Sequence, residues 1–352
     1  MRNFFLVKAL PGLLIGCIFS LPVFSQSVDS LRKQGLFDLL AKEEVAEITL
    51  VLDIDTLMAK VKTNDYIKGE FRINKKKEEQ PLALPVRIRP RGKFRRMTCD
   101  FPPIKLKFKK DDLEANGLGK YNEFKLVTHC MEDEEVSKEM ILREYLIYKL
   151  YNVLTPYSFR VQLVKVTYQH ERRKSVKIKR WGILIEDLDD LAHRNDSKIV
   201  SRMGIPLDSL HDNQEKIAST FQFMIGNCDW SYLMARNTEF IKLQDGQIAP
   251  IPYDFDYAGV VNAPYARYDP TMGQTSIRDR VYLGYATSAD NLRSIFSYFK
   301  TKKEALYQII NGCTQISKLA KKDMREYLDS FYTLIEDKVQ FEATFAERKR
   351  RK

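Results

Sequence analysis

The chain has 352 residues, of which 44% are hydrophobic and 30% are charged. This composition supports a buried core and excludes an intrinsically disordered or fibrous chain. The formal net charge is +11, and much of it lies in three separate basic clusters, Lys75–Lys77, residues 172–180 and Arg348–Lys352. Because the clusters are scattered, they indicate solvated loops and a basic tail at 347–352 and do not indicate a nucleic-acid surface.

Residues 1–25 have the pattern of a secretory signal peptide. Arg2 and Lys8 are their only charged residues, and residues 9–25 are largely apolar, with small residues near the end. A positive start followed by a short apolar stretch is typical of a signal for export. We predict cleavage before Gln26 and an exported protein, in the periplasm or at the cell surface, away from nucleic acid.

Two alternatives to the cleaved signal stay open. Residues 14–17 (LIGC) have the form of a lipoprotein cleavage box, which would leave Cys17 lipidated, although the apolar run continues to Phe24. A retained anchor is the other, but the apolar run is shorter than the roughly 20 residues needed to span a bilayer. Later segments are less apolar still, so we predict no transmembrane segment after signal removal.

Residues 26–190 are predicted to form a sheet-rich N-terminal lobe. The clearest helix is 133–154, where apolar residues form one stripe and acidic residues crowd the first turn. Alternating apolar residues with many β-branched side chains predict strands at 46–54, 85–91, 104–109, 124–128, 159–168 and 182–187.

Residues 191–346 are predicted to form a mainly helical C-terminal lobe. Strands at 238–243 and 247–252 are joined by Gln244-Asp245-Gly246, which is a hairpin signal. The predicted fold is therefore α+β, with a protein-kinase-like arrangement of two lobes. Helical periodicity predicts helices at 208–226, 289–299, 302–312 and 316–340.

Four cysteines follow Cys17, namely Cys99, Cys130, Cys228 and Cys313. They are widely spaced without a C-x-x-C pair, so we expect no zinc site. Export permits a disulfide between Cys99 and Cys130. The alternative is that the cysteines are small buried hydrophobic residues with free thiols.

Three polar residues near the predicted hairpin suggest phosphoryl transfer. This reaction needs a carboxylate to accept the proton of the attacking hydroxyl and oxygen ligands to hold Mg²⁺. Asp229 follows a predicted helix, Asn237 precedes the first strand of the hairpin, and Asp254 follows the second strand. Because the hairpin returns the chain, we expect Asp254 to lie near Asn237.

These segments resemble the spore-coat-protein-H (CotH) kinase-like family. Residues 226–229 (GNCD), Asn237 and residues 251–256 (IPYDFD) are similar to its Asn-x-Asp loop, downstream Asn and Ile-Pro-Trp-Asp-x-Asp segment. Residues 89–92 (RPRG) resemble its Arg-Gly turn, and residues 104–108 (IKLKF) the basic strand that follows. The resemblance covers roughly residues 45–260 and implies an ATP-dependent kinase-like site with Mg²⁺ or Mn²⁺.

The resemblance also implies a role for individual residues. Asp229 would be the catalytic carboxylate, Asn237 and Asp254 would hold the metal, and Asp256 is a second candidate ligand. In the nucleotide site, Lys105 or Lys107 would contact the phosphates, and Glu144 (or Glu139) would pair with that lysine. The turn Arg91-Gly92-Lys93 would cover the phosphates, and Glu186 would lie at the end of a later strand.

Two functions from different classes stay open at this point. The first is an exported atypical kinase that transfers phosphate from ATP to a protein or an envelope polymer. The second is a non-catalytic binding or scaffold protein of the cell envelope. The sequence departs from the family pattern in ways that bear on this choice. Tyr253 replaces the commoner Trp, and the turn at Gly92 has a single glycine followed by bulky and basic residues.

Overall fold

The computed structural model describes Met1 and residues 33–73, 82–92, 94–285, 288–337, 339–340 and 344–345. Most of the predicted signal peptide, the basic cluster at 75–77, Lys93 and the basic tail therefore lie outside the described residues. Residues Lys33–Lys352 form one compact unit. The predicted boundary between the lobes, at 190/191, falls inside the short helix α6 (Leu188–Arg194) of this unit.

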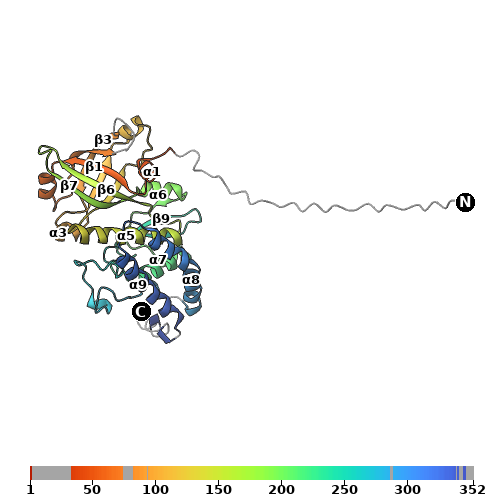
Figure 1. Cartoon of the computed structure of the whole chain (residues 1–352). Coiled ribbons are helices and arrows are strands. Elements are labelled where there is room, and N and C mark those ends of the chain that lie inside the picture. Colours follow the sequence, from red (N-terminus) through yellow and green to blue (C-terminus); the bar gives the residue numbers. More distant parts are fainter. Residues whose placement is uncertain are drawn as a thin grey trace. The chain divides into compact units, whose positions relative to one another are not determined.

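Seven strands of this unit form a closed barrel in the order β1-β2-β3-β4-β5-β7-β6 (Figure 1). Neighbouring strands pair antiparallel, except that β1 and β6 pair parallel, from Ala46 opposite Val164 to Leu52 opposite His170. The strands are β1 (Ala46–Leu52), β2 (Ile67–Ile73), β3 (Leu82–Pro90), β4 (Ile104–Phe108), β5 (Glu123–Val127), β6 (Val161–His170) and β7 (Lys177–Ile185).

The predicted α+β fold with two kinase-like lobes is wrong. A kinase-like N-terminal lobe has an open sheet, whereas here the parallel pairing of β1 with β6 closes the sheet into a barrel. The strand β2, which the sequence analysis did not predict, lies between β1 and β3 and is needed for this closure.

Apolar side chains that alternate along the strands fill the barrel. In β4, for example, Ile104, Leu106 and Phe108 are buried, whereas the lysines between them are half-buried. The short helices α1 (Leu36–Leu40), α2 (Ile54–Ala59) and α4 (Lys110–Ala115) add further apolar side chains to the same cluster. Removing this surface from water is the main force that stabilises the barrel.

The long helix α5 (Glu134–Leu154) packs against the outside of the barrel (Figure 1). It begins where the Asp133 carboxylate accepts a hydrogen bond from the backbone N–H of Val136 at 2.9 Å. Its other side contacts the C-terminal helices, so one continuous apolar cluster joins them to the barrel wall. These helices are α7 (Asp212–Ile225), α8 (Ala289–Gly312) and α9 (Lys318–Glu336).

A small second sheet holds the predicted hairpin. Strands β9 (Thr238–Lys242) and β10 (Ile248–Pro252) pair antiparallel, which confirms the hairpin, and β8 (Lys198–Ile199) adds an edge to β9. The predicted helix at 133–154 is also confirmed. The two helices predicted at 289–299 and 302–312 are a single helix, α8, because no helix-breaking residue separates them.

A disulfide joins Cys99 and Cys130, which decides between the two alternatives left open by the sequence. Cys228 and Cys313 are free thiols. Cys99 directly follows the four-residue helix α3 (Arg95–Thr98), and Cys130 lies between β5 and α5. Among the described residues, no helix is both long enough and apolar enough to cross a membrane.

Candidate functional site

The loop after α7 is fixed by a left-handed glycine and a buried asparagine. Gly226 has φ +67° and ends α7, a conformation that glycine adopts at little cost. Asn227 is fully buried, and its Oδ1 accepts a hydrogen bond from the backbone N–H of Asp229 at 3.0 Å. The Trp230 ring donates from Nε1 to the Asn227 carbonyl at 3.1 Å. These contacts hold Asp229 at a defined position beyond the helix.

The hairpin brings Asn237 and Asp254 together at its open end. The backbone N–H of Tyr253 donates to the Asn237 carbonyl at 3.1 Å. Asn237 has φ +50° and Asp254 has φ +64°, a left-handed region that non-glycine residues seldom adopt. Tyr148 on α5 helps to hold this conformation, since its hydroxyl accepts a hydrogen bond from the backbone N–H of Asp254 at 2.8 Å. Such strained residues cluster at functional sites.

Asp229 and Asn237 contact each other directly. The Asn237 amide donates to the Asp229 side chain at 2.9 Å and to its backbone carbonyl at 2.7 Å. Arg236 Nε lies 3.4 Å from the other carboxylate oxygen of Asp229. Burial raises the pKa of Asp229 above its usual value, although Arg236 opposes the shift. A carboxylate with a raised pKa and partial exposure is suited to accept a proton.

These residues line one cavity of about 760 Å³. Asp229, Asn237, Asp254 and Asp256 come to it from the C-terminal part of the chain. Arg91 and Gly92 directly follow β3, so the cavity lies where the barrel meets the second sheet. The other lining residues are Asn64, Arg89, Phe94, Arg95, Arg96, Pro103, Met203, Met234, Ala235, Arg236, Tyr253 and Tyr257.

A buried arginine lies among the carboxylates of this cavity. Arg95 on α3 has a side chain only 7% exposed and forms ion pairs with Asp254, with Asp256 and with Glu144 of α5. The Arg95 Nε to Asp256 Oδ2 distance is 2.7 Å, and Arg95 Nη2 lies 3.4 Å from Glu144 Oε1. The predicted helix residue Glu144 therefore pairs with this arginine and not with a lysine.

The pKa values of the three carboxylates move in different directions. Burial alone would raise the pKa of Asp254, but the charges of Arg95, Arg91 and Lys125 outweigh it, so the pKa lies below its usual value. Burial dominates at Asp256 and Glu144 and raises the pKa of both. Asp254 is thus the most firmly ionised carboxylate of the cluster.

Several residues predicted to bind the nucleotide lie elsewhere. Neither Lys105 nor Lys107 is among the residues that line the cavity, and both form ion pairs with Glu123 on the neighbouring strand. Glu186 is buried and pairs with Arg160 at 2.7 Å and with Arg194 at 2.8 Å. The structure therefore does not bring these three predicted residues to the cavity.

Sequence reasoning missed two basic residues near the site. Neither Arg95 on α3 nor Lys125 on β5 was among the predicted site residues. Lys125 forms an ion pair with Glu239 at 2.9 Å and lies 3.9 Å from the ring centroid of Tyr253, and burial lowers its pKa. The only available signal was weak, namely a basic residue within an otherwise apolar strand.

The donor atoms at the hairpin fit a hard divalent cation. Asn237, Asp254 and Asp256 offer amide and carboxylate oxygens, which are the ligands that Mg²⁺ and Mn²⁺ prefer. The guanidinium groups of Arg89, Arg91 and other arginines lie around the same cavity and fit phosphate oxygens. As the side chains stand, however, Arg95 holds the oxygens of Asp254 and Asp256.

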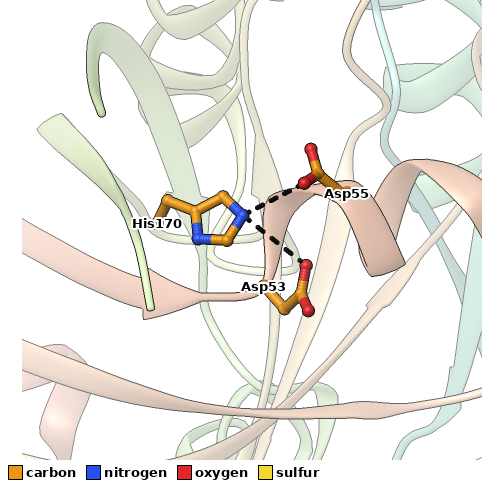
Figure 2. A group of neighbouring side chains, drawn as sticks. All are labelled: Asp53, Asp55 and His170. Carbon is orange, nitrogen blue, oxygen red and sulfur yellow. Dashed lines mark hydrogen bonds and ion pairs between the residues drawn. The ribbon is translucent and has the colours of Figure 1, made fainter. Parts of the chain in front are cut away.

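A second group, Asp53, Asp55 and His170, places its potential ligand atoms within 4.8 Å of one another (Figure 2). His170 Nδ1 accepts hydrogen bonds from the backbone N–H groups of Arg172 at 3.1 Å and Arg173 at 3.3 Å. The neutral ring therefore carries its proton on Nε2, which lies 3.3 Å from Asp55 Oδ2. Because Nε2 is then a donor, we assign no metal to this group.

Neither a scan of protein-family models nor a search of the curated proteins finds a match to this chain. The resemblance to the CotH family therefore stays a prediction that rests on the residues quoted for it. What the site can do has to be argued from its own geometry.

Proposed function

We propose that the cavity at Asp229, Asn237 and Asp254 is an ATP- and cation-dependent phosphotransfer site that acts on a hydroxyl group of a protein or an envelope polymer. One observation carries the proposal. Three residues from separate segments, selected by sequence pattern alone, line a single cavity together with Arg91 and Gly92. With the predicted signal peptide, this activity would be located in the periplasm or at the cell surface.

The residues of the cavity have different roles in the proposed reaction. Asp229 accepts the proton of the acceptor hydroxyl while that oxygen forms its bond to the terminal phosphorus, and the nucleoside diphosphate leaves with the electrons of the broken bond. The Asn237 amide orients Asp229 through the hydrogen bond at 2.9 Å. Arg91 and its neighbours neutralise the phosphate chain. Asn237 and Asp254 would hold the cation, which supplies charge neutralisation of the phosphate oxygens.

The second candidate is a non-catalytic binding protein, and Arg95 favours it. A guanidinium that already satisfies Asp254 and Asp256 gives the cluster a cation of its own. If this arrangement is permanent, the cavity would bind an anionic ligand through its arginines and transfer nothing.

Calorimetry and label transfer separate the two candidates. The full-length protein is titrated with ATP in the presence of Mg²⁺ or Mn²⁺, and transfer of the terminal phosphate is followed with labelled ATP. We expect binding and transfer in the unmodified protein, and a loss of transfer by a factor of about 10²–10⁴ in Asp229→Asn. Asp254→Asn should weaken the binding of nucleotide with cation.

Asp245→Asn is the matched control. Asp245 lies in the hairpin turn, at the opposite end from the cavity, and an asparagine can still accept the hydrogen bond from the backbone N–H of Gln247. This variant should keep full activity. Binding of ATP without transfer under every cation condition would favour the non-catalytic candidate. A lack of nucleotide binding both with the disulfide intact and with it reduced would rule out the phosphotransfer site.

A further inference from the structure

We propose that Arg95 closes the cation site as a built-in counter-ion, and that the Cys99–Cys130 disulfide keeps it closed. The inference concerns the regulation of the proposed site and rests on the proposed function. It follows from where Arg95 lies, from what holds α3 in place, and from how a cation and a guanidinium share carboxylates.

Arg95 occupies the oxygens that a cation would need. It forms ion pairs with Asp254 Oδ1 and, at 2.7 Å, with Asp256 Oδ2, and it approaches Glu144 at 3.4 Å. A divalent cation binds such oxygens directly and would bring two further positive charges next to the guanidinium. The two cations repel each other in this poorly solvated place. Cation binding therefore requires the Arg95 side chain to move away.

The helix that carries Arg95 buries no apolar side chain of its own, although Phe94, which precedes it, contacts the Tyr257 ring. α3 has four residues, and Arg95 is its one buried side chain. Met97 is exposed to 61%, and so short a helix is not stable by itself. Its neighbour Arg96 donates to the Thr63 carbonyl at 2.8 Å and to Asn64 at 3.1 Å, both on the surface. α3 thus has no apolar anchor of its own.

The disulfide is the covalent tie of this segment. Cys99 caps α3, with its backbone N–H donating to the Arg95 carbonyl at 2.9 Å. Its partner Cys130 precedes α5, the helix that supplies Glu144. The backbone N–H of Asp100 also donates to the Cys130 carbonyl at 2.8 Å. The disulfide therefore keeps the end of α3 beside α5 and restricts how far Arg95 can withdraw from the carboxylates.

Reduction would release this restraint. A dithiol reductant supplies two electrons and two protons, the sulfur–sulfur bond breaks to give two thiols, and the reductant becomes a disulfide. Without this covalent bond α3 is held by non-covalent contacts alone, among them the hydrogen bonds of Arg96 and Asp100, so Arg95 can leave Asp254 and Asp256 to a cation more readily. The oxidised protein is then the closed form of the site, and the reduced protein is the open form.

Binding of Mn²⁺ alone, without nucleotide, tests the inference. Free Mn²⁺ is measured by electron paramagnetic resonance for the oxidised protein, the reduced protein and a Cys99→Ser/Cys130→Ser variant. We expect the reduced protein and the double variant to bind Mn²⁺ about tenfold more tightly than the oxidised protein, an ordinary size for coupling between two sites. A Cys228→Ser/Cys313→Ser variant should respond to the reductant as the unmodified protein does.

Arg95→Gln tests the role of the Arg95 charge directly. It should bind Mn²⁺ tightly in both redox states, and Arg95→Lys should restore weak binding in the oxidised state. If Arg95→Gln fails to fold because its carboxylates lose their counter-ion, the cysteine variants still decide. Equal affinity in the oxidised and reduced protein, or no Mn²⁺ binding in any form, overturns the inference.

The outcome also separates the inference from the proposed function. Redox-dependent Mn²⁺ binding without any binding of ATP would leave the closing role of Arg95 intact and refute phosphotransfer. Equal binding of ATP with Mn²⁺ in both redox states would refute the closing role of Arg95 and leave the proposed phosphotransfer intact.

Discussion

Replacing Gly226 by alanine should lower the free energy of unfolding by more than the cost of placing an alanine in the left-handed backbone conformation. Gly226 has φ +67°, and a Cβ added there would lie 2.0 Å from Tyr327 Oη. Tyr327 cannot withdraw easily, because its side chain is buried and its hydroxyl donates to the Arg278 carbonyl at 2.9 Å. The Arg280 guanidinium also lies 3.9 Å from the centroid of its ring.

Gly204 provides the reference for the magnitude. It has the same φ of +67°, but an added Cβ would meet no atom within 4 Å. For Gly204→Ala, the left-handed backbone destabilises the folded protein by about 1–2 kcal/mol, whereas the less flexible unfolded chain stabilises it by about 0.4–1 kcal/mol. The free energy of unfolding should therefore fall by about 1 kcal/mol. Gly226→Ala adds the cost of overpacking, about 1–3 kcal/mol, for a total of about 2–4 kcal/mol.

Urea unfolding of both variants measures this difference. The double variant Gly226→Ala/Tyr327→Phe lacks the closest atom, leaving Tyr327 Cζ at 3.1 Å, so it should recover part of the overpacking cost. Tyr327→Phe alone removes the hydrogen bond to Arg278 and should lower the free energy of unfolding by about 1 kcal/mol. The reasoning fails if the two alanine variants lose the same stability within about 0.5 kcal/mol, or if the double variant shows simple additivity.

Three further predictions concern single buried polar side chains. Burial lowers the pKa of His129 to about 4, whereas the unfolded chain binds the proton near pH 6.5; the free energy of unfolding should therefore fall by about 2–3 kcal/mol between pH 7 and pH 4.5. His129→Phe, which keeps the stack on Phe101, should lose this part of the pH dependence in urea titrations. Asp187 accepts hydrogen bonds from three backbone N–H groups at 2.8–2.9 Å, so Asp187→Asn should lower the unfolding free energy by about 1–3 kcal/mol, and the exposed Asp189→Asn should change it little. Glu186→Gln breaks a buried ion pair and should cost about 3–5 kcal/mol in thermal or urea unfolding, while the affinity for ATP stays unchanged; a selective loss of ATP affinity would return Glu186 to the nucleotide site.

The parts of the site that depend on local sequence could be predicted. Asp229 follows a helix that ends at a glycine, and Asn237 and Asp254 flank a hairpin with a clear turn signal. Each of these signals extends over only a few residues. The hairpin pairing then places Asn237 and Asp254 together as a matter of geometry. The place of Asp229 beside them was expected only from the resemblance to the CotH family.

The closed barrel could not be predicted in this way. Its closure depends on β1 and β6, which are far apart in the chain and pair in parallel. Local periodicity carries no signal for such a pairing. The missing strand β2 (IKGEFRI) interrupts its apolar alternation with Lys68, Gly69 and Glu70. An open sheet was the natural interpretation of the remaining strands.

The position of Arg95 was hidden for a related reason. It lies in a run of basic residues, and such runs are usually solvated. Its burial depends on carboxylates from two distant segments, one with Glu144 and the other with Asp254 and Asp256. No sequence pattern near Arg95 predicts that these carboxylates surround it. A buried charge is tolerated only where the fold assembles its partners, so the assembled structure alone could place it.

The arrangement of charge in the cavity narrows the kind of ligand that we expect. Asp256 is buried and Asp254 is half-buried, whereas Arg91 is half-buried and Arg236 is exposed. A bare anion in the cavity would meet the carboxylates of Asp254 and Asp256, and a bare cation would meet the guanidinium groups of Arg91 and Arg236. A phosphate chain that carries its own cation complements both regions at once. Because Arg95 already supplies part of that positive charge, we expect the position of this one side chain to decide whether the cavity accepts the pair or only the anion.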